Sequence, residues 1–287
     1  MSNKYLNAVV VATICGTFLQ GCLKDEAGTG QFSLGVTDAP VDSASNVFVQ
    51  FSGVELKGKD THTFTFDEPK KIDLLTLQGS ASLDLLDNVS LPSGKYQWVR
   101  LMVDTAGAQD TYIVLDDGSE HELTIPGGLE SGLKLVRGFS ISENGNSNFT
   151  VDFDVRKSVV DSNNGYHLKP ALRITDNLEI GHIKGSVSPT LFANSCTAPV
   201  VYAFEGQVTP TDISGATTDP VTTALVSLDD ADSSYKYELG FLESGTYTLG
   251  LTCESGNDNV EDVDTISFIN TVEATVEAKL KTTQDFL

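Results

Sequence analysis

The strongest constraint on the fold is a strict alternation of apolar and polar residues along Phe149-Thr150-Val151-Asp152-Phe153-Asp154-Val155-Arg156. Successive side chains of a β-strand point to opposite faces, so this pattern predicts a strand with one face on a core and the other in solvent. Residues 97–103 alternate in the same way, with Trp98 and Arg100 on the polar face. No segment after residue 22 keeps the spacing of an amphipathic helix. The sequence therefore predicts an all-β fold.

Short segments rich in β-branched and aromatic residues continue along the chain, separated by turns built on Gly, Asn and Asp. Strands are expected at 32–36, 47–51, 64–66, 112–115, 122–125, 133–141, 168–174, 200–204, 224–228, 236–241, 246–252 and 264–268. A short helical turn is expected at 80–86, where the leucines do not alternate. Many short strands with regular turns are typical of a β-sandwich. We predict two sandwich domains of immunoglobulin-like or transthyretin-like type, at residues 31–181 and 182–287.

The first residues have the features of an export signal. Lys4 and the free amine precede an apolar stretch, 8–19, that is too short to span a bilayer. Leu19-Gln20-Gly21-Cys22 follows and resembles the lipobox of bacterial lipoproteins, from which Gln20 departs mildly. In that family the chain is cut before the cysteine, whose thiol and new amine are acylated. The resemblance implies a signal peptide at 1–21 and a lipid on Cys22; the alternative is an ordinary secretory signal with an incidental cysteine.

The residues after Cys22 bear on location. Residues 22–30 are polar and contain Gly, as expected for a lipidated tether. Leu23 stands where an Asp would favour inner-membrane retention, so the resemblance to lipoproteins implies the cell envelope and its outer membrane. Whether the protein faces the periplasm or the outside is left open.

Two cysteines are left once Cys15 departs with the signal and Cys22 carries lipid. Cys196 and Cys253 form an even pair in an oxidising compartment, which favours a disulfide. The alternative is a pair of buried thiols.

A short pattern, Leu-x-Ser-Gly-x-Tyr, occurs in both halves, as Leu91-Pro92-Ser93-Gly94-Lys95-Tyr96 and as Leu242-Glu243-Ser244-Gly245-Thr246-Tyr247. Gly is expected to supply a turn with positive φ, and Tyr to begin the next strand with its ring packed. The pattern resembles the turn before a strand in transthyretin-like and carboxypeptidase-regulatory-like sandwiches.

A longer resemblance covers roughly residues 30–178. The runs Thr37-Asp38-Ala39-Pro40 and Leu168-Lys169-Pro170, among others, resemble the bacterial domain of unknown function DUF4382. Members of that family are commonly lipoproteins with a further β domain behind. The resemblance therefore implies a fold and a location, and no reaction.

The charge narrows the choice of partner. The net charge of -22 repels phosphate backbones, so no nucleic-acid partner is expected. An acidic surface suits divalent cations, basic partners or solubility alone.

Three sets of residues are candidates for chemistry. Asp38 and Asp42 flank Pro40, and either converge on Ca²⁺ or form a turn in which Asp38 caps backbone amides. Trp98 and Arg100 either form a platform for a sugar or an aromatic partner, or Trp98 packs under a loop or second sheet.

The third set is Asp152 and Asp154. Two carboxylates on one strand face suit glycoside chemistry, and equally suit a solvated face on which Arg156 is the salt partner.

The sequence favours a non-catalytic, membrane-anchored envelope protein that binds or bridges an envelope protein or glycan. A Ca²⁺- or glycan-binding surface module is the alternative, and a hydrolase using Asp152 and Asp154 is the second alternative. Apart from Ca²⁺ in the first alternative, no cofactor is expected.

Overall fold

A computed structural model describes residues 28–287, apart from 40–43, 127–132, 163, 170, 193–195, 197, 215, 217 and 261. Cys22 and Asp42 lie outside the described residues, so the predicted lipidation and half of the predicted calcium site have no structural account. Over the described residues, no helix combines the length and the apolarity that a membrane crossing requires.

The structure is all-β, as predicted, and built of sandwiches. The strands up to residue 176 form three sheets. The first sheet has the order β14 (Leu172–Asp176), β11 (Asn146–Asp154), β1 (Thr29–Ala39) and β4 (Leu83–Pro92). A two-stranded sheet pairs β10 (Phe139–Ile141) with β5 (Gly94–Tyr96). The third sheet has the order β12 (Val159–Ser162), β13 (Gly165–Leu168), β8 (Glu120–Thr124), β7 (Tyr112–Leu115), β2 (Ala44–Lys57), β6 (Trp98–Asp104) and β9 (Leu133–Leu135), with β3 (Thr61–Asp73) paired to β2.

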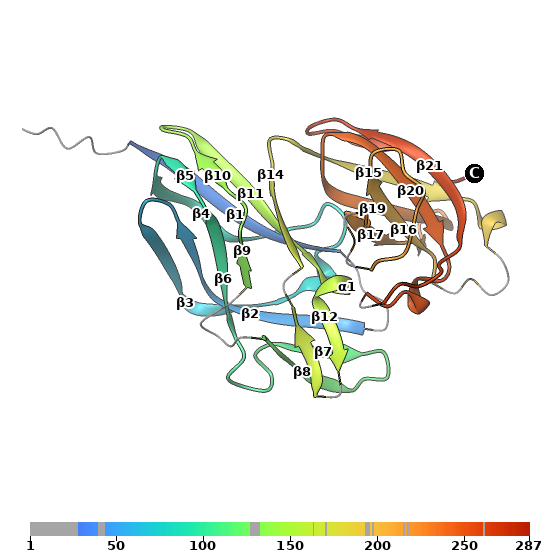
Figure 1. The fold of residues 1–287 in the computed structure, drawn as a ribbon, viewed down its shortest axis with the longest axis horizontal. Helices are drawn as coiled ribbons and strands as arrows, with labels where there is room; N and C mark the ends of the chain where they lie inside the picture. The colour runs from blue at the N-terminus through green and yellow to red at the C-terminus, as the bar shows by residue number, and fades with distance from the viewer. Residues whose placement is uncertain are drawn as a thin grey trace, which may run out of the picture.

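The strands from residue 180 onward form two separate sheets. One has the order β18 (Ser227–Asp229), β19 (Ser234–Glu243), β15 (Ile180–Val187) and β22 (Lys281–Thr283). The other has the order β17 (Thr222–Leu225), β16 (Val200–Glu205), β20 (Gly245–Thr252) and β21 (Phe268–Val276). Short helices complete the chain: η1 (Leu74–Thr76), α1 (Val155–Ser158), η2 (Pro189–Leu191) and η3 (Ser255–Asn257). Figure 1 shows β1 to β14 gathered in one half of the molecule, β15 to β21 in the other, and α1 where the halves meet.

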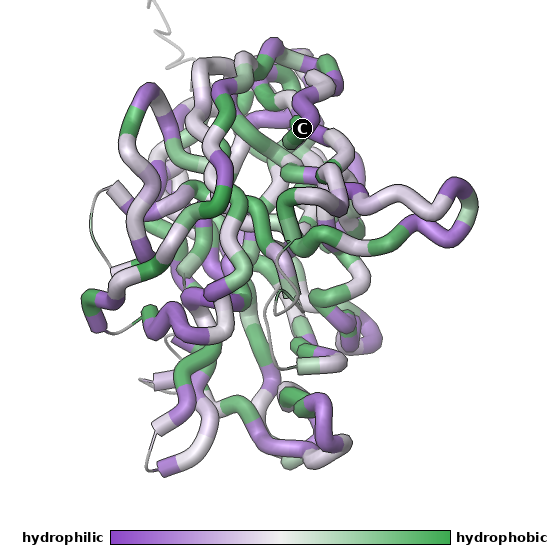
Figure 2. Tube along the Cα trace, turned by 90° about the vertical axis from the view of Figure 1, so that its right-hand side faces the viewer, coloured by the Kyte–Doolittle hydropathy of each residue, from purple (hydrophilic) through white to green (hydrophobic). Residues whose placement is uncertain are grey.

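Each half has its own hydrophobic core. In the first half the rings of Phe32, Phe139 and Phe149 pack with centroids 5.1 to 5.9 Å apart, between the sheet of β1 and that of β6. In the second half Leu239 of β19 and Leu249 of β20, one from each sheet, belong to one core and are almost fully buried. Hydrophobic positions accordingly follow the inner strands, and hydrophilic ones the outer loops (Figure 2). The cores explain the alternation, because every second side chain of a strand enters one of them.

The predicted alternation is confirmed on β6 and is only half right on β11. On β6 the side chains alternate between buried and half-buried, with Trp98 and Arg100 on the outer face. On β11 Phe149, Val151 and Phe153 enter the core, but the opposite face, which includes Asp152, is buried as well. The second half of the chain lies near this face, because Val221 lines the same cavity as Asp152 and Asp154.

Several local predictions were wrong. The segment 80–86 contains the start of β4 instead of a helical turn, and the strand predicted at 264–268 is β21, which starts at Phe268 instead of ending there. The segments 133–141, 168–174 and 224–228 were each predicted as one strand, but each contains parts of two strands that belong to different sheets. The segment predicted to continue through Arg156 ends at Asp154, because the Asp154 carboxylate accepts a hydrogen bond from the Lys157 amide and starts α1.

The repeated Leu-x-Ser-Gly-x-Tyr pattern builds the same corner twice. The Tyr96 hydroxyl donates to the Pro92 carbonyl at 3.0 Å, and the Tyr247 hydroxyl donates to the Glu243 carbonyl at 2.8 Å. Both rings are buried. Gly94 adopts the expected positive φ, +137°, whereas Gly245 does not. The shared corner anchors the strand that pairs with the first strand of each half, β4 with β1 and β19 with β15.

The two halves meet through charged side chains and a close backbone contact. Arg156, 6% exposed, donates to the Ser255 carbonyl at 3.1 Å and lies 5.8 Å from the centre of the Tyr202 ring. A Cβ on Gly240 would lie 1.7 Å from the Gly79 carbonyl oxygen, so only glycine permits this approach. The two halves are therefore in direct contact, both through the buried Arg156 and through the backbone at Gly79 and Gly240.

Candidate functional site

Asp38 lies at the end of β1 with only 4% of its surface exposed. Its Oδ1 accepts a hydrogen bond from the Val155 amide at 3.3 Å, so the side chain caps the start of α1. Its Oδ2 makes no hydrogen bond in the described part of the chain. Burial first, and then the nearby Asp152 and Asp154 carboxylates, raise the pKa of Asp38 well above its usual value.

The calcium site predicted at Asp38 and Asp42 stays a prediction. Among the described residues, no group of three or more His, Cys, Asp or Glu side chains is placed to hold a metal ion. Since Asp42 is not described, the structure gives only the Asp38 half of the predicted pair.

Asp152 and Asp154 lie next to a cavity of about 230 Å³ at the junction of the two halves. The Arg173 guanidinium donates to Asp152 Oδ2 through Nε at 2.9 Å and through Nη2 at 2.6 Å. Burial raises the pKa of Asp152, and Arg173 opposes that rise. Lys157 pairs with Asp154 at 3.1 Å. The predicted solvated face with Arg156 as the salt partner was therefore wrong.

Both carboxylates serve local structure. Asp154 caps the Lys157 amide, and the Lys157 ammonium reaches across the junction to the Pro220 carbonyl at 2.6 Å. Asp152 is held by Arg173 from the neighbouring strand β14. Buried charges in folded proteins are ordinarily paired in this way, because an unpaired one is strongly unfavourable.

Trp98 and Arg100 lie side by side on the outer face of β6, as predicted. The Lys134 ammonium sits 4.3 Å from the centre of the indole ring, and Arg100 pairs with Glu55 at 2.5 Å. Trp98 is half-buried and does not belong to the hydrophobic core. Its ring is therefore neither covered by a second sheet nor fully exposed to solvent. This face combines an aromatic ring with cations at the surface.

Cys196 and Cys253 form the predicted disulfide, with their Cα atoms 5.1 Å apart. Cys253 lies two residues before Ser255, whose carbonyl receives Arg156 from the first half. The disulfide thus holds a segment that contributes to the junction.

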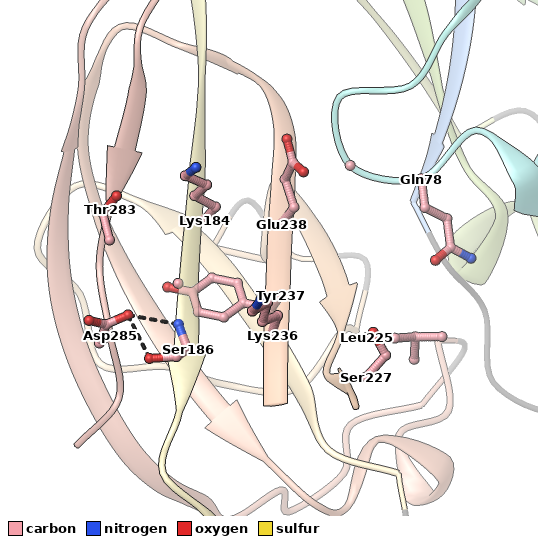
Figure 3. Close-up of a pocket in the computed structure, with 12 residues that line it drawn as sticks. Gln78, Lys184, Ser186, Leu225, Ser227, Lys236, Tyr237, Glu238, Thr283 and Asp285 are labelled. Atoms are coloured by element: carbon pink, nitrogen blue, oxygen red, sulfur yellow. Dashed lines mark hydrogen bonds between the residues drawn. The ribbon is translucent and has the colours of Figure 1, made fainter. Parts of the chain in front are cut away.

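A second cavity, of about 500 Å³, lies between the loop at Gln78-Gly79 and the outer face of β15, β19 and β22. Figure 3 shows its polar lining. The Asp285 carboxylate accepts from the amide and the hydroxyl of Ser186 at 2.7 and 2.9 Å. Lys236 pairs with Asp229 and Asp232. Lys236, Glu238 and Asp285 of the cavity lining are therefore already engaged with other protein groups.

Sequence reasoning missed the junction residues Lys157 and Arg173, and gave Arg156 the wrong partner. The residue types did not indicate burial, because an Arg or Lys on a strand or turn is ordinarily solvent-exposed. The only available signal was the pair of aspartates on β11, whose charges require nearby cations if that face is buried.

These features define an all-β protein of two sandwich halves, with Arg156 and Lys157 of the first half donating to backbone carbonyls of the second. Residues 29–170 match the family model described as "Domain of unknown function (DUF4382)". The resemblance to that family inferred from the sequence is confirmed for this stretch.

Solved structures resemble the chain only weakly. The TIE protein of Bacillus anthracis is 12% identical, with 90% of this chain aligned to 33% of that one and a TM-score of 0.20. The minor pilin GBS52 of Streptococcus agalactiae is 9% identical, with 89% and 94% of the two chains aligned and a TM-score of 0.20.

The shaft pilin of Lactobacillus rhamnosus GG is 10% identical, with 90% and 96% aligned and a TM-score of 0.18. TM-scores this low support no inference about function. Among curated proteins, none matches the chain.

Proposed function

We propose that this protein is a lipid-anchored, non-catalytic module of the bacterial envelope that presents two β-sandwich halves as one rigid body. The observation that carries the proposal is the junction, where Arg156 is buried against the second half and Gly79 touches Gly240. Contacts of this kind hold the two halves together, as a module that presents both as one body would need.

The state of the acidic residues supports a non-catalytic role. A carboxylate that acts as an acid, base or nucleophile needs an oxygen directed at the substrate. Asp152 and Asp154 instead hold Arg173, Lys157 and the start of α1. The hydrolase alternative would have to displace these ion pairs.

The lipid anchor rests on the Leu19-Gln20-Gly21-Cys22 motif. Several acyl chains give stable attachment, since each buried methylene contributes about 0.8 kcal/mol. An outer-membrane location is proposed on Leu23.

Labelled palmitate in the native cell tests the anchor. We expect label on the wild-type protein and on Cys15→Ser, and none on Cys22→Ser. Cys15→Ser is the matched control, because it removes a cysteine from the same short segment. Equal labelling of all three variants, or no label on the wild type, would refute the anchor.

A further inference from the structure

The outer face of the β2–β6–β9 ribbon gathers cations around one aromatic ring. Lys57 pairs in register with Trp98, and Arg100 pairs in register with Lys134. We call these four residues the Trp98 face. Because Val99 and Leu101 enter the core, Trp98 and Arg100 point outward. The exposed Lys59 and Lys95 lie close by along the chain.

The charge of this face is opposite to that of the rest of the molecule. The chain has 18 Lys and Arg against 40 Asp and Glu. The Trp98 face has three cations; Glu55 pairs with Arg100 on this face, and the exposed Asp60 lies beside Lys59 in the turn after β2. An anionic partner is therefore repelled by most of the surface and attracted here, which orients its approach.

The polar groups around the ring suit a saccharide. Lys134 lies over the indole with its ammonium 4.3 Å from the ring centre. On the adjacent strand β3, the exposed Thr61 and Thr63 pair with Lys57 and Glu55 and so bring hydroxyls to the same face. An aromatic ring, hydroxyls and cations together supply what a sugar bearing carboxylates needs: an apolar surface, hydrogen bonds and counter-charge.

We propose that the Trp98 face binds an acidic glycan, a saccharide chain whose sugars carry carboxylates. A carboxylate of the glycan pairs with Lys134 and draws the ammonium away from the indole, whose uncovered surface then packs on a sugar ring. This assignment rests on the proposed function, since it names a partner class for the non-catalytic module. No bond is made or broken.

Because Trp98 is the only tryptophan, its fluorescence reports on this face directly. The probe is polygalacturonate, with neutral dextran as the uncharged comparison, added to the full chain in a neutral detergent. We expect a saturable change in indole emission with polygalacturonate, weakened by salt, and none with dextran.

Two charge reversals localise the binding. Lys134→Glu is expected to weaken the affinity for polygalacturonate by about tenfold or more, because an attraction becomes a repulsion beside the ring. Lys71→Glu is the matched control: Lys71 is also exposed, and lies 5.6 Å from the Tyr112 ring elsewhere on the same sheet. It is expected to leave the affinity unchanged. Trp98→Ala, followed by co-sedimentation, is expected to weaken binding as well, and circular dichroism checks that each variant is folded.

Several outcomes would overturn the assignment. Equal weakening by both reversals would mean a response to net charge alone. A fluorescence change with anionic phospholipid vesicles and not with polygalacturonate would make the face a lipid-contacting surface. Absence of binding while Cys22 still incorporates palmitate would remove the glycan site and leave the anchored module standing. Release of new reducing ends from bound polygalacturonate would refute the non-catalytic function, even with the binding site intact.

Discussion

The Arg173 guanidinium donates two hydrogen bonds to a single oxygen of Asp152, at 2.9 and 2.6 Å, across strands β14 and β11. Asp152 is 4% exposed, so this pair compensates a charge that the rest of the chain has removed from solvent. The pair also borders the junction cavity that includes Val221 of the second half.

Arg173→Met should destabilise the protein by about 3–5 kcal/mol, because it leaves the buried Asp152 carboxylate without its partner. Urea unfolding measures the change. The double variant Arg173→Met with Asp152→Asn should recover much of the lost free energy of unfolding, because it no longer buries an unpaired carboxylate. An Arg173→Met protein as stable as the wild type would show that Asp152 is protonated or paired elsewhere.

The raised pKa of Asp38 predicts that the free energy of unfolding falls as the pH rises. Its pKa is raised in the folded protein, so the folded state holds the proton more tightly than the unfolded chain does. The contribution of Asp38 to the free energy of unfolding is therefore largest at low pH. It falls as the pH rises above the ordinary value of 3.8, until the pH passes the raised pKa.

Asp38→Asn keeps an oxygen for the Val155 amide and removes the charge. Urea midpoints of the variant and the wild type should converge near pH 3.8 and separate toward neutral pH, with the variant more stable. A variant that is less stable at neutral pH would point to a cation on Asp38. In that case added Ca²⁺ should raise the melting temperature of the wild type only.

The contacts of Arg156 across the junction predict that the two halves unfold together. Arg156→Ala removes the contacts with the Ser255 carbonyl and the Tyr202 ring, so the halves should unfold in separate steps. Trp98 fluorescence follows the first half only, whereas far-ultraviolet circular dichroism follows both. The two denaturation curves should coincide for the wild type and diverge for Arg156→Ala. Coincident curves for both proteins would mean that contacts other than those of Arg156 are sufficient to make the two halves unfold together.

The Cys196–Cys253 disulfide closes a loop with a sequence separation of 57 residues. Replacing both cysteines by serine should lower the free energy of unfolding by about 4 kcal/mol, because the unfolded chain regains the entropy of that loop. Unfolding in urea, with and without a reductant, measures this. The reductant should shift the midpoint of the wild type and leave that of the double variant in place.

The two tyrosine corners predict a matched pair of effects. Tyr96→Phe and Tyr247→Phe each remove one hydrogen bond to a backbone carbonyl and keep the buried ring. Each should lower the free energy of unfolding by about 1 kcal/mol. A large destabilisation by one substitution and none by the other would show that the two tyrosine hydroxyls do not stabilise their halves equally.

Several features were determined by the sequence alone, because they depend on backbone geometry or on counting. The apolar residues of β6 and β11 repeat every second position, so the all-β fold and the inward face of each strand follow locally. Once two cysteines are assigned to the export signal, the sequence favours a disulfide between the other two, Cys196 and Cys253, over a pair of buried thiols. The outward position of Trp98 follows from Val99 and Leu101 beside it.

The tertiary structure alone decided what lies against each outer face. Asp152 is buried instead of solvated, and the second half lies near that side of β11. Arg156 pairs across the junction with Ser255, 99 residues away, and not with the aspartates beside it in the sequence. Strand periodicity states which side chains share a face but contains no information on what covers it. That depends on contacts between residues far apart in the chain.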